Sequence, residues 1–140
     1  WSQADEHLLS TGVTSWCPTL VSAPLEKMFA ATLNIKSQMQ IRDSSVAVPR
    51  ASIIGVHLEG PFLGAAIGAH NKNSVVDIDL IWISELPECV AIMTIGAEQE
   101  ESIEAIQART TISESTLLSG FLYNECLVSF AGHIPEELCF

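Results

Sequence analysis

The stretch Ile53-Ile54-Gly55-Val56-His57-Leu58-Glu59-Gly60-Pro61-Phe62 decides how the rest of the chain is interpreted. Its first half is apolar and prone to form a strand, and it reaches one His and one Glu before Gly60-Pro61 ends it. Residues i and i+2 of a strand share a face, so His57 and Glu59 point the same way. Polar side chains at the end of a buried strand are costly unless they are paired or used. The stretch therefore predicts a functional site at the end of a buried strand.

Short apolar segments alternate with helix-like segments along the chain. We expect strands at 13–21, 51–58, 90–95 and 127–131. We expect helices that end at Ser10, run from Ser22 to Ile35, and cover 75–86 and 100–109, with a strand as the alternative for 75–86. Residues 37–50 are polar and predict a loop, whereas 111–124 fits no single element. Continuous apolar strands separated by helices are typical of a parallel sheet with both faces covered. The sequence thus predicts an α/β fold.

In such folds the chemistry lies beyond the carboxyl ends of the strands. Five polar side chains fall at these ends: Thr19, His57, Glu59, Glu98 and His133. Glu59 suits a Zn²⁺ ligand, or it caps a neighbouring backbone N–H. A neutral His133 also suits a metal, or it is a surface histidine at a helix start. The residues alone leave both interpretations of each side chain open.

Two further histidines have two interpretations each. His57 shares the face of Glu59, and it either belongs to the site or fixes the following loop by hydrogen bonding. His70 lies in the small-residue loop Gly68-Ala69-His70-Asn71, where it contacts either a substrate or only solvent. A role in chemistry for either one depends on its neighbours in space.

Composition limits the function classes. The chain has 140 residues, enough for one modest domain, and a net charge of −11 with six Lys and Arg. An acidic chain repels phosphate backbones, so we expect no nucleic-acid partner. No apolar run reaches the roughly 18–20 residues of a membrane span, so we expect no membrane partner. Four widely spaced cysteines without a C-x-x-C pair favour reduced thiols, and hence a cytoplasmic protein.

Several motifs taken together resemble one family, the N-acetylglucosamine-6-phosphate deacetylases of the amidohydrolase superfamily. The string Gly55-Val-His-Leu-Glu-Gly-Pro-Phe62, followed by Gly68-Ala-His70, carries most of the resemblance. The other matching pieces, in family order, are Leu8-Leu-Ser-Thr-Gly-Val-Thr-Ser-Trp-Cys-Pro-Thr-Leu20, Met93-Thr-Ile-Gly-Ala-Glu98 and Val128-Ser-Phe-Ala-Gly-His133.

The resemblance implies a fold and a division of the chain. It implies a partial TIM (β/α)8 barrel that holds about strands 2 to 5 of the amidohydrolase barrel, as a single domain over residues 1–140. Residues 99–126 look longer than the family's connection and are expected to be a divergent insertion. The chain starts without Met and ends shortly after an apparent helix start, so we expect it to be a partial chain.

The resemblance also implies residue roles. Glu59 and His133 look like metal ligands, Ala69 and His70 look like contacts to the substrate, and His57 looks like a support for the site. The general-base Asp and a further metal-ligating His of the family are expected outside this chain. The 140 residues alone are therefore expected to be catalytically inert.

The implied reaction is hydrolysis of the N-acetyl amide of N-acetylglucosamine 6-phosphate to acetate and glucosamine 6-phosphate, in aminosugar catabolism. A divalent metal, with Zn²⁺ as the first choice, would activate water and polarise the acetyl carbonyl. The expected partner is this small amino-sugar phosphate, and a homo-oligomer of the full-length protein stays open. Two alternatives are a truncated, non-enzymatic interaction protein and another amidohydrolase, such as a dihydroorotase-like enzyme.

Overall fold

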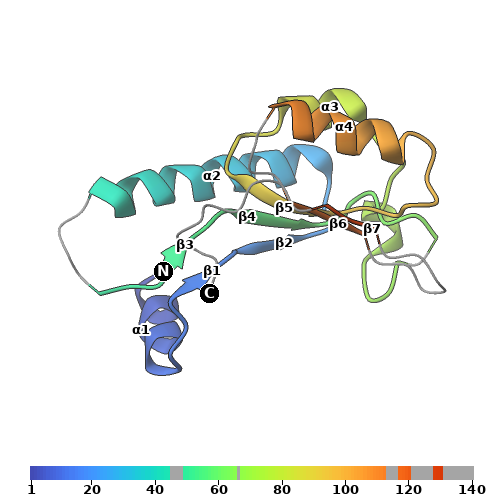
Figure 1. Cartoon of the computed structure of the whole chain (residues 1–140). Helices are drawn as coiled ribbons and strands as arrows, with labels where there is room; N and C mark the ends of the chain where they lie inside the picture. Colours follow the sequence, from blue (N-terminus) through green and yellow to red (C-terminus); the bar gives the residue numbers. More distant parts are fainter. Residues whose placement is uncertain (45–48, 66, 113–116, 121–127, 131–140) are drawn as a thin grey trace.

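A five-stranded sheet forms the centre of the molecule (Figure 1). The computed structural model describes residues 1–44, 49–65, 67–112, 117–120 and 128–130. The strands of this sheet, in spatial order, are β2 (Thr19–Val21), β4 (Val56–Glu59), β5 (Val90–Thr94), β6 (Leu117–Gly120) and β7 (Val128–Phe130). A smaller sheet pairs β1 (Ser15–Trp16) in parallel with β3 (Ser52–Ile53). The α/β class predicted from the sequence is confirmed.

The direction of the last strand differs from the prediction. The pairs β2–β4, β4–β5 and β5–β6 are parallel, whereas β6 and β7 are antiparallel. A parallel connection needs a dozen or more residues, but only residues 121–127 join β6 to β7. The prediction of a parallel last strand is therefore wrong. β7 therefore runs in the opposite direction, and its carboxyl end lies on the side of the sheet where β2, β4 and β5 have their amino ends.

The strand expected at 51–58 is broken at Gly55. β3 ends at Ile53, and β4 begins at Val56 and continues to Glu59. The φ of Gly55 is 152°, and a Cβ at this position would collide with the side chain of Ala91 in β5. Glycine is needed here because the two backbones approach too closely for any side chain.

The helices are α1 (Ser2–Ser10), α2 (Leu25–Ser44), α3 (Leu80–Glu85) and α4 (Ser102–Ile112), with a 3-10 turn η1 (Lys72–Ser74). α2, α3 and α4 lie together on one face of the five-stranded sheet, whereas α1 lies apart from them, beside β1 (Figure 1). The sequence predicted that helices cover both faces of the sheet, but the described helices cover one face. None of the described helices has the length and apolarity needed to cross a membrane.

Two helix boundaries differ from the prediction because of contacts distant in sequence. α2 continues through the expected loop to Ser44, since Met39 packs against the core and Arg42 forms an ion pair with Asp5 of α1 at 2.6 Å. α3 covers only the second half of the expected helix. The Asp79 carboxylate accepts the backbone N–H of Trp82 at 2.9 Å, which caps α3 and fixes its start.

The core lies between the sheet and the three helices. In β4 the side chains of Val56 and Leu58 are fully buried, whereas His57 and Glu59 are only partly buried. Successive side chains of a strand face opposite sides, so the apolar pair packs toward the helices and the polar pair lies on the other face. The principal core residues are Met28, Ile35, Val56, Leu58, Phe62, Trp82, Ile83, Val90, Met93, Ala105 and Ile106.

Candidate functional site

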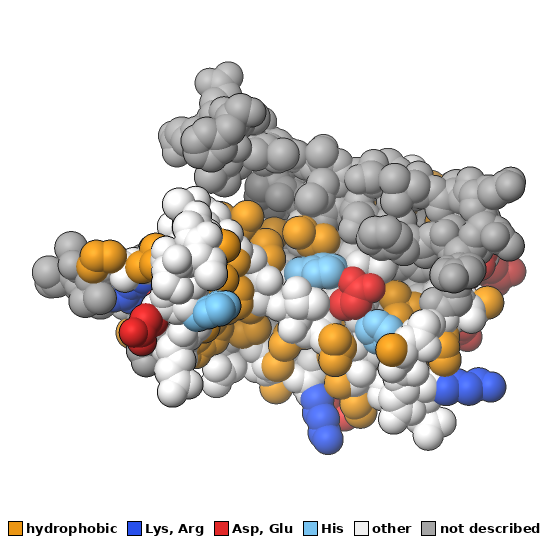
Figure 2. Space-filling model, turned by 90° about the horizontal axis from the view of Figure 1, so that it is seen from below, with side chains coloured by type: hydrophobic (Ala, Val, Ile, Leu, Met, Phe, Trp, Pro, Cys, Tyr) orange, Lys and Arg blue, Asp and Glu red, His pale blue; other side chains and the backbone are white. Residues whose placement is uncertain are grey.

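Four polar side chains from three neighbouring strands meet near the carboxyl ends of β4 and β5 and the start of β2. Thr19 of β2 pairs in register with His57 of β4, and Glu59 at the end of β4 pairs with Thr94 at the end of β5. We call these four residues the strand-end cluster. The cluster lies on the sheet face opposite the helices. That face is the side of the molecule seen in Figure 2, where histidine and acidic side chains lie close together among hydrophobic ones.

Hydrogen bonds join the whole strand-end cluster. The Thr94 hydroxyl donates to Oε2 of Glu59 at 2.8 Å. His57 Nε2 lies 3.1 Å from the Thr94 oxygen and 3.1 Å from the same Glu59 Oε2. His57 Nδ1 lies 3.2 Å from the Thr19 hydroxyl. His57 therefore supports Glu59 and contacts both neighbouring strands.

The surroundings keep His57 uncharged near neutral pH. Burial lowers the pKa of His57 below its usual value of 6.5, and the nearby Glu59 carboxylate only partly opposes this shift. The His57 side chain is 20% exposed and that of Glu59 is 30% exposed, so both groups remain within reach of a ligand.

The chain turns sharply directly after Glu59. Gly60 has a φ of 87°, and a Cβ on it would collide with the Ser22 hydroxyl and the Leu63 side chain. The Ser22 hydroxyl in turn donates to the backbone oxygen of Glu59 at 3.3 Å. Glycine at position 60 thus allows the tight packing that fixes the backbone of Glu59.

The loop that follows is tied to the rest of the molecule at its base. The N–H of Val76 donates to the oxygen of Pro61 at 3.2 Å, and the N–H of Gly96 donates to the oxygen of Phe62 at 2.6 Å. The Glu98 carboxylate accepts the N–H of Ala65 at 3.0 Å. Glu98, which the sequence placed at a strand end, therefore holds this loop.

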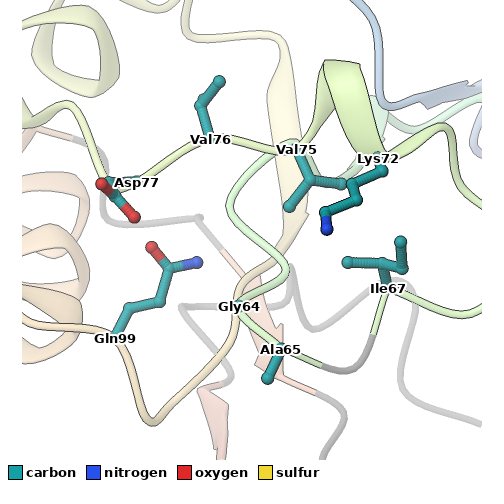
Figure 3. Close-up of a pocket in the computed structure, with 8 residues that line it drawn as sticks. All are labelled: Gly64, Ala65, Ile67, Lys72, Val75, Val76, Asp77 and Gln99. Carbon is teal, nitrogen blue, oxygen red and sulfur yellow. The ribbon is translucent and has the colours of Figure 1, made fainter.

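The two expected substrate contacts lie near the tip of this loop. Ala69 is exposed and His70 is partly buried, and the N–H of His70 donates to the oxygen of Ile67 at 3.0 Å. An open pocket of about 650 Å³ lies beside the loop, and Lys72 and Gln99 line opposite sides of it (Figure 3). The pocket-lining residues are Gly64, Ala65, Ile67, Lys72, Val75, Val76, Asp77 and Gln99. In the sequence, Ala69 and His70 lie between the pocket-lining residues Ile67 and Lys72, but they do not line the pocket themselves.

The residues that the structure describes do not form a complete metal site. Within them, no group of three or more His, Cys, Asp or Glu could hold a metal ion, and His133 lies outside them. A catalytic zinc site has three protein ligands. Glu59 nevertheless has one oxygen, Oε1, with no hydrogen bond to another described residue, because Thr94 and His57 both contact Oε2. The carboxylate of Glu59 is therefore suited to bind a cation.

Sequence reasoning placed His57, Glu59 and Thr19 at strand ends but gave no role to Thr94. The only sequence signal was a polar residue near the end of the apolar strand at 90–95. The contact between Thr94 and Glu59 depends on the register between β4 and β5, and that register shifts between Val56 and His57. A single sequence does not contain this information.

Curated proteins resemble this chain over most of its length. N-acetylglucosamine-6-phosphate deacetylase of Bos taurus is 38% identical over 113 residues, which are 76% of this chain and 26% of that protein. The human enzyme of the same name is 37% identical over 111 residues, 74% of this chain and 26% of that protein. N-acetylgalactosamine-6-phosphate deacetylase of Escherichia coli O157:H7 is 31% identical over 109 residues, 72% of this chain and 27% of that protein.

The fold supports the same relationship. The crystal structure of N-acetylglucosamine-6-phosphate deacetylase from Thermotoga maritima matches with a TM-score of 0.72 and 28% identity, over 85% of this chain and 31% of that chain. No protein-family model matches the chain. The chain spans about a quarter of the length of the curated relatives. The predicted resemblance is thus confirmed: this chain is similar, over about three-quarters of its length, to one part of the N-acetylglucosamine-6-phosphate deacetylases.

Proposed function

We propose that this chain forms part of a metal-dependent hydrolase that removes the acetyl group from an N-acetylhexosamine 6-phosphate. The observation that carries the proposal is the position of Glu59, whose carboxylate is fixed at the end of β4 within a chain similar to these deacetylases. N-acetylglucosamine 6-phosphate is the first candidate substrate, since it appears in the names of most of the relatives. The proposed setting is the cytoplasm.

The proposed architecture is a segment of a TIM-barrel wall, about strands 2 to 5. The parallel strands β2, β4, β5 and β6 with helices on one face are what such a segment would contain, whereas the antiparallel β7 departs from it. In this arrangement the face that carries the strand-end cluster would line the barrel interior. Glu59 would then lie at the carboxyl-terminal rim, where barrel enzymes place their active sites.

The proposed metal ion is Zn²⁺, and Glu59 would bind it through Oε1. His133, which lies outside the described residues, is the proposed second ligand. Since β7 runs antiparallel, the chain after Phe130 would have to return to the rim where Glu59 lies for His133 to reach the metal. Further ligands would come from outside the described residues. Once bound, the metal would polarise the acetyl carbonyl and activate a water molecule. Glu59 contributes a carboxylate held by Thr94 and His57, so that its orientation is set before the ion arrives.

Ala69 and His70 are the proposed substrate contacts, on the loop that follows β4. The neighbouring pocket contains the amine of Lys72, a cation that suits a phosphate group. The relatives act, by their names, on either the glucosamine or the galactosamine compound, so the proposal does not fix the sugar epimer.

The test is acetate release by a protein that carries this chain within its complete reading frame. We expect Glu59→Gln to lower kcat/KM for N-acetylglucosamine 6-phosphate by about 100-fold or more, since even residues that only support metal ligands account for 10- to 100-fold. Glu104→Gln, at an exposed position of α4, is the matched control and should retain full activity.

Two further measurements complete the test. Zinc content should fall in Glu59→Gln and in His133→Asn, but not in Glu104→Gln. Both N-acetylhexosamine 6-phosphates should be assayed, because the preferred epimer then follows from kcat/KM. An active Glu59→Gln protein with a normal zinc content would contradict the proposed role of Glu59.

A further inference from the structure

We infer that Thr94 is a positioning residue, whose hydroxyl fixes both the Glu59 carboxylate and the tautomer of His57. The inference rests on the proposed function in one respect only, namely that the ligand left to Glu59 Oε1 is a metal ion. The arrangement of the hydrogen bonds is argued from the geometry of the strand-end cluster alone.

Proton counting gives the direction of each hydrogen bond. A threonine hydroxyl has one proton, and an ionised carboxylate can only accept. The 2.8 Å contact between Thr94 and Glu59 Oε2 therefore uses the Thr94 proton. The Thr94 oxygen can then only accept, and the group that lies 3.1 Å from it is His57 Nε2. His57 must therefore carry a proton on Nε2.

A second contact leads to the same tautomer. His57 Nε2 is also 3.1 Å from Glu59 Oε2. An unprotonated nitrogen would bring two electron pairs face to face there, whereas an N–H is attracted to the carboxylate. With the proton on Nε2, Nδ1 of the neutral ring is an acceptor for the Thr19 hydroxyl at 3.2 Å. The hydrogen bonds thus run in order from Thr19 through His57 and Thr94 to Glu59.

Among the described residues, this order leaves one oxygen of Glu59 without a hydrogen bond. Thr94 is 2% exposed, so water does not compete for its hydroxyl. Both donors, Thr94 and His57, converge on Oε2, which prevents the carboxylate from rotating. Oε1 is then the oxygen presented to a cation. Valine at position 94 would keep the shape of threonine but remove the donor, so Glu59 would keep His57 as its only support.

The experiment compares Thr94→Val, Thr94→Ser and a matched control in the chain as printed. Thr32→Val is the control, since Thr32 is also fully buried and its hydroxyl contacts only the Met28 oxygen of its own helix. ¹⁵N NMR of the metal-free protein at about pH 8, where an ordinary imidazole is neutral, reports which nitrogen of His57 carries the proton. Zinc affinity is measured by titration calorimetry on the same variants of a protein that carries this chain within its complete reading frame, because the described residues alone hold no complete zinc site.

We expect a protonated Nε2 in the wild type and a changed Nε2 signal in Thr94→Val. Zinc affinity should fall by about 10- to 100-fold in Thr94→Val, return in Thr94→Ser, and stay unchanged in Thr32→Val. Wild-type zinc affinity in Thr94→Val, or a wild-type His57 protonated on Nδ1, would overturn the inference. A third outcome is possible, in which the His57 signals change as expected in Thr94→Val but the wild-type protein binds no zinc. That outcome would support the hydrogen-bond order and overturn the proposed metal site.

Discussion

At the residue scale, two glycines have similar positive φ angles but differ in their surroundings. The φ angles of Gly12 and Gly60 are 82° and 87°. A Cβ on Gly12 would meet nothing within 4 Å, whereas one on Gly60 would collide with Ser22 and Leu63. The pair therefore compares a positive φ in open space with a positive φ combined with close packing beside the candidate site.

We predict that Gly12→Ala lowers the free energy of unfolding by about 1 kcal/mol, the cost of the left-handed conformation. Gly60→Ala should lower it by about 3 kcal/mol, because overpacking adds to the cost of a positive φ. Equilibrium unfolding in urea measures both values. Equal losses in the two variants would show that the contacts of Gly60 relax easily and do not constrain Glu59.

At the element scale, one ion pair joins α1 to α2. The Arg42 guanidinium donates to both carboxylate oxygens of Asp5, at 2.7 and 2.6 Å, and also to the backbone oxygen of Ala51 at 3.1 Å. The hydrogen bonds from Arg42 lower the pKa of Asp5 below its usual value of 3.8, although burial opposes the shift. An acidic group whose pKa is lower in the folded state than in the unfolded state stabilises the folded state at every pH at which the group is ionised.

We predict that Asp5→Asn destabilises the protein at neutral pH and that this effect disappears in acid. The stabilisation by Asp5 is complete above its unfolded-state pKa and is lost as the pH falls through the lower folded-state value. Thermal unfolding of wild type and variant between about pH 7 and pH 2 measures the difference. Glu6→Gln, at the exposed neighbouring position, is the control and should lack this pH profile. A difference that persists unchanged in acid would contradict the assignment.

Local patterns predicted some elements well, and tertiary contacts decided the others. The alternation Val56-His57-Leu58-Glu59 correctly predicted that His57 and Glu59 share one face, and the structure adds that this face lies opposite the core. The extension of α2 to Ser44 depends on Arg42 and Met39 finding neighbours far away in sequence. The reversal at β7 follows from a short connection that no residue periodicity reveals. Within the site, the pairing of Thr94 with Glu59 required the strand register.

At the scale of the whole molecule, the outermost parallel strand has an open edge. Within the described residues, β2 pairs in the five-stranded sheet only with β4, and Val21 is 63% exposed. An unpaired edge with an apolar side chain invites pairing with another chain. The chain as printed should therefore self-associate through β2.

We predict that Val21→Lys weakens this self-association, because a charge on an edge strand opposes pairing. Ile81→Lys is the control, since Ile81 of α3 is 73% exposed but lies on no sheet edge. Analytical ultracentrifugation of the three proteins measures the change. The free energy of unfolding of either variant should stay within about 0.5 kcal/mol of wild type. Equal self-association of wild type and Val21→Lys would exclude β2 as the contact.

The loop after β4 has a consequence for how such a protein can evolve. Its base is bound through Pro61, Phe62 and Ala65, while Ala69 and His70 lie beyond these ties. Mutations near the tip thus alter what the loop touches at little cost to folding, whereas mutations at the base disturb the core. Under the proposed function, selection could therefore adjust sugar recognition through the tip without a compensating change elsewhere. A lineage built on this scaffold could change its specificity by single, nearly neutral steps.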